Sequence, residues 1–422
     1  MSIPADTGVL LEHLFRRQAG RMVSHLTRLL GPANLDLAEE TVQEAMLRAL
    51  QTWPYQGVPE RAEAWLFRVA HNAAIDALRR RRFSAPSEDE SQEDTIAALA
   101  RAADTIPDRP DLEEHLRDEE LRMIFMCCHP EIPRDAAVAQ SLKTVGGFGV
   151  NEIARAFLAE EATIAQRLVR AKRQIRDRGL TLDMPAGRDL PPRLDAVLEV
   201  IYLIFNEGYT AHEGDALIRH DLCGEALRLG RLMADSSLAA PRVHALVALM
   251  AFQAARSPAR IDSLGDLVVL EDQDRSRWNQ DLIALGFQHF ERSIAGGAPS
   301  VYHAQAAIAA TYARAASGAD IDWHMILSLY DDLLAMNPSP VVALNRAVAV
   351  AKVQGPEAGL AAIEKLRSHP RLRGYYLLPA LRGHLLLELD RRGEAAGCFR
   401  AALECRCSEP ERRFLRRRLE SA

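Results

Sequence analysis

The spacing of the apolar residues is the feature that most constrains this fold. They recur about every three to four residues along almost the whole chain, as in amphipathic helices. We find no run with the strict alternation that is typical of a half-buried strand. The sequence therefore predicts an all-α protein. Its 422 residues are enough for roughly two to four domains.

The sequence contains no predicted membrane segment. The longest apolar run, residues 243–255, is too short to cross a bilayer and includes His244 and Gln253. The first residues lack the basic start, apolar core and small-residue cleavage site of a signal peptide. We therefore expect a cytoplasmic protein without membrane association.

Charge and composition divide the chain into four segments. Residues 84–120 carry 13 acidic and 3 basic side chains, whereas the blocks on either side are mildly basic. We expect two small helical domains at 8–83 and 121–184, joined by an acidic linker at 84–120. A nearly neutral helical extension at 190–422 follows. The linker is rich in Ser, Asp, Glu and Pro, so we expect it to be flexible near Ser84–Asp94.

The first candidate site lies on a predicted helix from Ala62 to Arg82. One polar face, with residues spaced by helical turns, is formed by Arg68, Asn72, Asp76, Arg79 and Arg80. Four consecutive arginines close the helix, which suits contact with a phosphate backbone. Trp65, near the helix start, could stack on an unpaired base. The alternative is a solvated charged face beside a core tryptophan.

The second candidate site is a pair of predicted helices between Val150 and Arg178. A short helix at 151–157, a turn at 158–160 and a longer helix from Glu161 have the proportions of a helix-turn-helix. Two groups are expected to face DNA, polar side chains at base edges and basic ones at phosphates: Thr163, Gln166, Arg167, Arg170, Lys172 and Arg173. The alternative is an ordinary helical hairpin, but the basic charge favours DNA binding.

Three stretches resemble parts of one known family. Residues 37–45 (LAEETVQEA) are similar to the polymerase-clamp helix of sigma factors. Residues 64–80 (AWLFRVAHNAAIDALRR) resemble the promoter-melting helix of the extracytoplasmic-function (ECF) group. Residues 152–154 and 162–172 resemble that group's second DNA-binding domain. The order and separation of the motifs also fit.

This resemblance implies a sigma factor that binds core RNA polymerase and directs promoter recognition, DNA melting and transcription initiation. Glu40, Gln43 and Glu44 would bind the clamp of the β′ subunit, and the β flap would be a second contact. The helix with Trp65 would open the minus-ten element, and the helix with Thr163 would read the minus-thirty-five element. The acidic linker would either enter a positively charged nucleic-acid channel of the polymerase or remain a solvated spacer.

The extension has a repetitive pattern of helix pairs at Pro338–Leu366 and Leu372–Leu403, with turns expected at Gly355 and Gly393. Small residues mark the expected helix contacts: Ala343, Ala347, Ala361, Gly383, Ala395 and Ala402. The period is near that of tetratricopeptide repeats, about 34 residues, so we expect a tetratricopeptide-like (TPR-like) domain.

The extension also resembles the fused C-terminal domain of one ECF subgroup. The matching stretches are residues 202–209, 270–278, 322–323 and 338–349. The size, near-neutral charge and repeat-like helix pairs of the extension predict a protein-interaction domain that governs sigma activity. It would either cover the DNA-binding helices until a signal releases them or hold the active arrangement. The resemblance also implies a protein partner such as a DGPF-motif (YCII-like) protein, and control without a membrane anti-sigma factor.

Two other functions remain open on the residues alone. One is a helix-turn-helix transcriptional regulator with a ligand- or protein-binding helical domain, which the clamp-like Glu40, Gln43 and Glu44 disfavour. The other is an enzyme in the extension, with candidate groups at Asn206-Glu207, Glu271-Asp272, His212, His220 and His303. No spacing joins these groups into a nucleophile–base or metal arrangement. Cys127-Cys128-His129 and Cys405-x-Cys407 lack a matching second pair, so we expect no metal and no cofactor.

Overall fold

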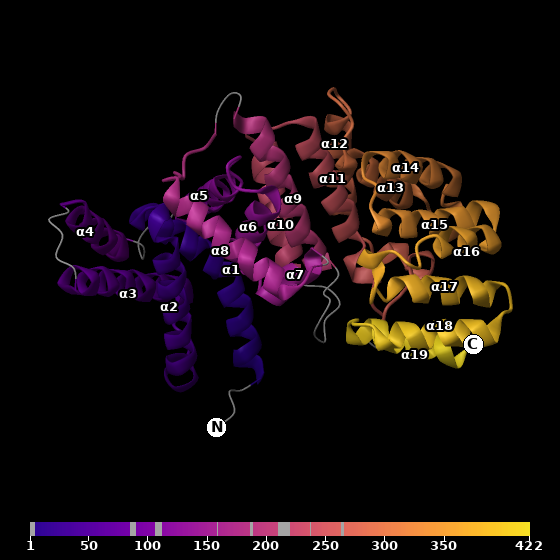
Figure 1. The fold of residues 1–422 in the computed structure, drawn as a ribbon, viewed down its shortest axis with the longest axis horizontal. Helices are drawn as coiled ribbons and strands as arrows, with labels where there is room; N and C mark the ends of the chain where they lie inside the picture. Colours follow the sequence, from indigo (N-terminus) through magenta and orange to yellow (C-terminus); the bar gives the residue numbers. More distant parts are fainter. Residues whose placement is uncertain are drawn as a thin grey trace. The chain divides into compact units, whose positions relative to one another are not determined.

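The computed structural model describes residues 5–84, 90–105, 112–157, 159–185, 189–209, 220–236, 238–262 and 266–422. The chain divides into two compact units, Met1–Leu203 and Ile204–Ala422 (Figure 1). Helices make up all the regular structure in the described ranges, where only isolated β-bridges occur and no strands. The prediction of an all-α fold is confirmed.

The first unit contains α1 (Ala5–Leu30), α2 (Leu35–Gln56), α3 (Ala62–Ser84), α4 (Glu90–Thr105), α5 (Leu112–Cys127), α6 (Arg134–Thr144), α7 (Val150–Ala156) and α8 (Glu161–Asp177). Helix α9 (Leu190–Tyr209) crosses the boundary between the units. The second unit contains α10 (His220–Ala234), α11 (Pro241–Ala255), α12 (Gln280–Ser293), α13 (Val301–Arg314), α14 (Trp323–Met336), α15 (Pro340–Gln354), α16 (Pro356–Glu364), α17 (Leu377–Glu388), α18 (Arg392–Glu404) and α19 (Glu409–Glu420).

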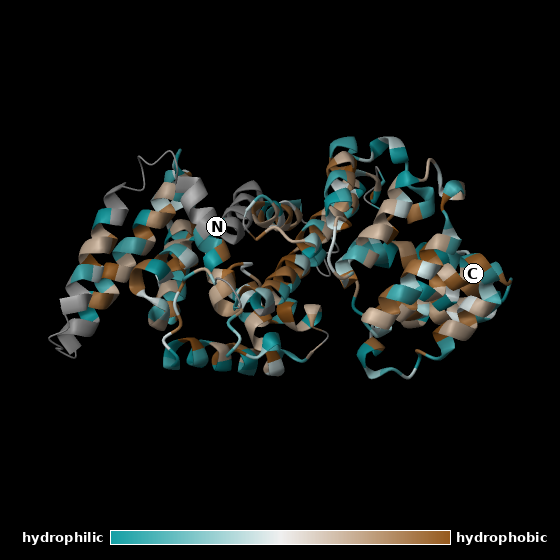
Figure 2. Ribbon diagram, turned by 90° about the horizontal axis from the view of Figure 1, so that it is seen from above, coloured by the Kyte–Doolittle hydropathy of each residue, from teal (hydrophilic) through white to brown (hydrophobic). Residues whose placement is uncertain are grey.

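Helices α1, α2 and α3 pack on one another. Along the helices of the chain, brown hydrophobic residues alternate with teal hydrophilic ones, as in amphipathic helices (Figure 2). In α2 the buried residues recur at helical spacing through Val42, Ala45, Ala49 and Trp53. The helix ends at Gly57, whose φ of 82° lies in the region that favours glycine. The face of α2 that lies opposite these buried residues stays open to solvent.

Part of the acidic linker is helical. Glu90–Thr105 forms α4, which packs alongside α3 and buries Leu99 completely (Figure 1). The expectation of flexibility near Ser84–Asp94 is therefore wrong for residues 90–94, while residues 85–89 lie outside the described residues. An apolar stripe within the acidic composition accounts for the helix, because it gives α4 a face to bury.

Helix α5 is joined to α1 by buried ion pairs. The Arg21 Nε lies 3.5 Å from a Glu120 carboxylate oxygen, and both side chains are at most 3% exposed. The His25 Nδ1 lies 2.8 Å from Glu119, which also accepts a hydrogen bond from Arg28. These pairs bring the end of the acidic segment against the first helix of the chain.

His71 of α3 is completely buried beside this network. Its Nδ1–H donates to the Phe67 carbonyl oxygen at 2.7 Å, and its ring centroid lies 5.2 Å from that of His25. Burial, together with the charge of His25, lowers the pKa of His71 to about 4. The folded protein therefore holds this imidazole neutral.

This low pKa makes the stability of the protein depend on pH. The pKa of histidine in an unfolded chain is about 6.5, so between that value and about 4 the unfolded state binds a proton that the folded state does not. We expect His71 to lower the free energy of unfolding by about 2 kcal/mol between about pH 7 and pH 5. Urea unfolding of the His71→Gln variant should show a correspondingly weaker pH dependence. An unchanged pH dependence would contradict this assignment.

The second unit is a succession of packed helix pairs. Its central helix α11 coincides with the longest apolar run and packs against α10, α12 and α13, so that run is a buried core helix. Helices α15 and α16 meet at Gly355, whose φ is 93°, as the sequence predicts. The second predicted turn joins α17 and α18. Its residue with a positive φ is Asp390, and Gly393 lies inside α18. The prediction of a turn at Gly393 is wrong.

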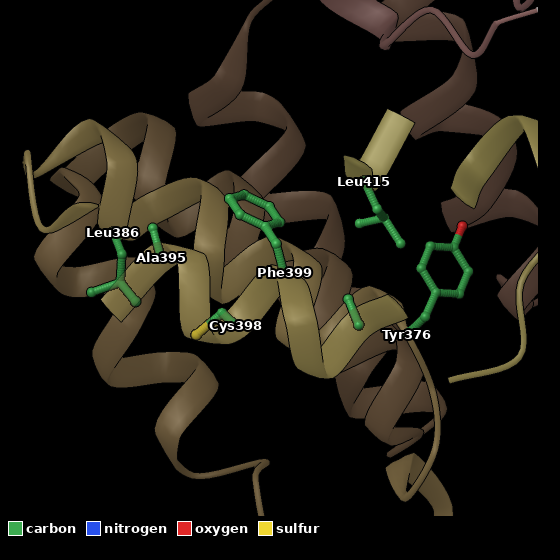
Figure 3. Packing of buried hydrophobic residues seen from close by; sticks show 7 residues of the cluster. Tyr376, Leu386, Ala395, Cys398, Phe399 and Leu415 are labelled. Carbon is green, nitrogen blue, oxygen red and sulfur yellow. The ribbon is translucent and has the colours of Figure 1, made fainter. Parts of the chain in front are cut away.

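The small residues mark most of the expected helix contacts. Ala347, Ala395 and Ala402 are completely buried, and Gly383 packs directly against the Phe399 ring. Ala361 is exposed, however, so its expected role at a helix contact is wrong. Figure 3 shows Leu386, Phe399 and Leu415, from three successive helices, in one apolar cluster.

We expect Phe399→Ala to destabilise the second unit by about 3–5 kcal/mol, because it removes an aromatic side chain that is 1% exposed and leaves a cavity. Thermal unfolding followed by circular dichroism measures the effect. Leu377→Ala is the control, since Leu377 is 36% exposed and loses much less buried area. Equal losses in the two variants would show that this cluster is not a core.

The described cysteines form no metal site. Cys127 and Cys128 are buried at the end of α5, and burial raises the pKa of both thiols, that of Cys128 to about 12. No group of three or more His, Cys, Asp or Glu residues in the described ranges is placed to hold a metal ion.

Candidate nucleic-acid interface

The polar face of α3 is open to solvent. Each of the five predicted polar residues is exposed even though α4 packs alongside the helix: Arg68, Asn72, Asp76, Arg79 and Arg80. The side chains of Arg81 and Arg82 lie outside the described residues. The apolar face of the same helix buries Leu66, Phe67 and Ala74 completely or nearly so. Because the apolar face of α3 is packed in the core, the polar row on its other face is held in a fixed position.

Trp65 belongs partly to the core and partly to the surface. Its ring meets that of Trp53 edge-on, with centroids 5.3 Å apart, and Trp53 is only 2% exposed. Trp65 itself is half-buried. The contact with Trp53 gives the indole a defined orientation, and its remaining exposed part can still meet a ligand.

Helices α7 and α8 form a tight two-helix unit with the predicted boundaries. Ile153 and Ile164 are completely buried where the helices meet, and Ala154 is 3% exposed at the crossing. The α7 start is capped by the Glu152 carboxylate, which accepts from the Gly149 N–H at 2.6 Å. Phe157 is half-buried, and the Arg167 guanidinium lies 5.5 Å from its ring centroid.

The predicted DNA-facing residues of α8 fall into two groups. Thr163, Gln166, Arg170 and Arg173 are exposed. The other two are held by acids on neighbouring helices: Arg167 pairs with Asp135 of α6 at 3.1 Å, and Lys172 pairs with two carboxylates of α2. Lys172 is thus turned toward the first segment of the chain, a placement that its own helix does not reveal.

A surface pocket of about 380 Å³ lies between the start of α6 and the outer face of α8. Four arginines and a single acid supply its charged lining: Arg134, Arg167, Arg170, Arg173 and Asp135. Three of these arginines pair with carboxylates: Arg134 with Glu199, Arg167 with Asp135 and Arg173 with Asp177. The lining itself keeps a net positive charge, which favours an anion such as a phosphate. Arg134 could not be predicted from the sequence as part of this site, because only the packing of α6 on α8 brings it to this face.

The exposed face of α2 carries the candidate polymerase contacts. Glu40 and Gln43 are exposed, and Glu44 is half-buried and pairs with Arg48 one turn later. Leu47, on the same face, is 57% exposed. The face therefore combines negative charge with apolar area.

Two of the polar groups considered for an enzyme, His303 and Glu271, make structural contacts. His303 accepts from the Ser300 N–H at 3.0 Å as a helix cap, and its other ring nitrogen lies 3.1 Å from the Ser293 carbonyl oxygen. Glu271 pairs with Lys352 at 3.0 Å. His212 lies outside the described residues.

No helix in the described part of the chain is both long and apolar enough to cross a membrane.

Comparisons with known proteins match two parts of the chain to families. Residues 14–84, which include α2 and α3, match the family described as sigma-70 region 2. Residues 193–294 match a family of unknown function, DUF6596. No solved structure matches the chain.

Two relatives extend this result. The chain is 42% identical over 389 residues, 92% of its length, to "Uncharacterized protein R00370" of Rhizobium meliloti, of which it covers 90%. It is 28% identical over 168 residues to "ECF RNA polymerase sigma factor SigE" of Mycolicibacterium smegmatis, covering 39% of this chain and 60% of that protein. The chain therefore belongs to the same family as the Rhizobium protein, and its residues 14–84 match sigma-70 region 2.

Proposed function

We propose that this protein is a sigma factor of the ECF type. It binds core RNA polymerase through α2, opens the minus-ten element with α3 and contacts the minus-thirty-five element with α7 and α8. The observation that carries the proposal is the exposed polar row of α3 within the sigma-70 region 2 match. The partial likeness to a mycobacterial ECF sigma factor supports the subgroup.

The α2 face fits a basic helical partner such as the β′ clamp. Glu40, Gln43 and Glu44 supply negative charge and hydrogen-bonding groups, and the neighbouring Leu47 supplies apolar area. Interfaces of this kind gain affinity from a buried apolar centre and specificity from charge at the rim. The polymerase is therefore expected to cover Leu47.

We expect Glu40→Arg to weaken binding to core polymerase at least about tenfold, because it places like charges against a basic clamp. Glu40 is exposed, so the variant should fold normally. Pull-down with purified core measures binding, and promoter-dependent run-off transcription measures function. Glu420→Arg, an exposed acid of α19, is the matched control.

The same assays separate the two candidate functions. A sigma factor supports specific initiation by core polymerase that has no other sigma factor. A helix-turn-helix regulator with a ligand- or protein-binding helical domain would bind DNA but leave core polymerase silent. Equal core binding by Glu40→Arg and the wild type would remove α2 from the proposed interface.

Helices α7 and α8 are proposed as a DNA-binding helix-turn-helix. The exposed Thr163 and Gln166 at the start of α8 would meet base edges. The arginine-lined pocket beside α6 would hold a backbone phosphate. In this reading Arg134 joins Arg170 and Arg173 as a phosphate contact.

Arg170→Ala should weaken binding to duplex DNA of any sequence and reduce the salt dependence of log K by about one unit of slope. The reason is that Arg170 is exposed and would contact a phosphate. Fluorescence anisotropy at several salt concentrations gives the slope. Arg400→Ala, at an exposed site on α18, should leave the slope unchanged. An unaltered slope in Arg170→Ala would take this side chain out of the DNA interface.

The second unit is proposed as a TPR-like regulatory domain that governs sigma activity through protein contacts. Its successive helix pairs are of the kind that stack into a continuous core. A DGPF-motif (YCII-like) protein remains the proposed partner. The acidic segment at 84–120 is proposed to lie near a positively charged channel of the polymerase, with α4 and the first half of α5 as its helical parts.

A further inference from the structure

The second unit contains a surface pocket of its own, which lies among α12, α13 and α14. Its volume is about 340 Å³. Helix α13 packs against both of the other helices, so the three form one wall of neighbouring segments (Figure 1). Small-molecule sites in proteins span roughly 300–1,000 Å³, and this pocket is at the lower end of that range. An occupant of this size is a molecule with a single ring or a short alkyl chain.

Most of the lining is apolar, and part of it is exposed to water. Ile294, directly after α12, and Met336, at the end of α14, both line the pocket and are 66% and 40% exposed. Met325 lies on the same face of α14 as Leu329 and Met336 and is 51% exposed. Large apolar side chains that gather in water around a pocket are typical of a binding surface. The apolar body of a ligand would cover them.

The charge of the pocket indicates which ligand fits. Asp332 is the single acidic residue of the described lining, which contains no lysine or arginine. It makes no hydrogen bond or ion pair within the described part of the chain. The preceding residue, Asp331, differs because it pairs with Arg346 of α15 at 2.5 Å. The Asp332 carboxylate is therefore available to a cation that enters the pocket.

The helix ends around the pocket add to this negative charge. Helix α12 ends at Ser293 and α14 ends at Met336, and both residues line the pocket. The carbonyl groups in the last turn of a helix carry partial negative charge, which attracts cations. Helix α13 begins beside the pocket, but its N-terminus is already capped by Ser300 and His303.

His303 has no free group to offer to an anion. Its Nδ1 accepts from the Ser300 N–H at 3.0 Å, so the ring proton is on Nε2. That nitrogen lies 3.1 Å from the Ser293 carbonyl oxygen, to which it donates. Both ring nitrogens are thus engaged in the fold. The pocket therefore favours a cation over an anion.

We propose that this pocket binds a small organic amine, whose apolar body lies against Ile294 and Met336 and whose ammonium group pairs with Asp332. Binding to the folded state would stabilise the stack of α12, α13 and α14 by mass action. The existence of the site does not depend on the sigma-factor assignment. Its consequence does rest on the proposed function, because the second unit would then make transcription responsive to an amine.

The first test compares three probes that share a phenyl ring and differ in their polar group: phenethylamine, phenethyl alcohol and phenylacetate. Calorimetric titration of the full-length protein measures the three affinities. The amine should bind about three- to fivefold more tightly than the alcohol, as expected for an ion pair with an exposed carboxylate. Phenylacetate should bind most weakly. Equal affinities for the amine and the alcohol would overturn the proposal.

The second test changes the charge at an exposed position, where the fold should be unaffected. Asp332→Asn should abolish the preference for the amine over the alcohol. Asp332→Lys should reverse the order, so that phenylacetate binds best. Asp331→Asn is the matched control and should keep the order of the wild type, because that side chain pairs with Arg346. A preference for the amine that survives in Asp332→Asn would also overturn the proposal.

The third test locates the bound amine. Methyl NMR of isotope-labelled methionine should show a shift of the Met336 signal on addition of phenethylamine, and Met336→Leu identifies that signal. Shifts of other methionines without Met336 would place the amine elsewhere and overturn the proposed site. Run-off transcription without any amine tests the proposed function separately. Failure of initiation together with a normal Met336 shift would refute the sigma factor and support the pocket.

Discussion

The arrangement of the first unit depends on two adjacent carboxylates, Glu119 and Glu120, buried against α1. Burial by itself raises the pKa of Glu119, but its hydrogen bond to His25 and the charges of His25 and Arg28 outweigh that effect, so the pKa lies below its ordinary value. An unpaired carboxylate at this depth would be strongly destabilising. Both carboxylates find their partners on α1 only when α5 packs on α1 in one register. Because α6, α7 and α8 follow α5, this register determines where the second DNA-binding segment lies.

Much of this unit follows from local sequence. The helical period predicts which faces of α2, α3 and α8 are apolar, and the exposed rows with Glu40, Asn72 and Gln166 lie on the opposite faces. In the second unit, the end of α15 was predictable because a glycine, Gly355, interrupts the helical period. These features depend on residues within a turn or two of each other, so the sequence contains the necessary information.

Contacts between distant segments could not be predicted in the same way. Nothing near Lys172 indicates that Asp36 and Glu39 are its partners, because they lie 136 and 133 residues away. The fit of Gly20 against Val145 is also invisible, since an isolated glycine in a helix usually signals only a weak point. In the second unit, Gly393 resembles a turn residue, but the left-handed conformation falls on Asp390. In each case tertiary packing decides the role of the residue.

The paired cysteines at the end of α5 have a consequence for redox chemistry. A thiolate reacts with peroxide or a disulfide far faster than a thiol does. With a pKa of about 12 for Cys128, only roughly one molecule in 10⁵ carries that thiolate at neutral pH. Desolvation thus keeps both thiols of this pair protonated, and their burial keeps oxidants away from the sulfur atoms.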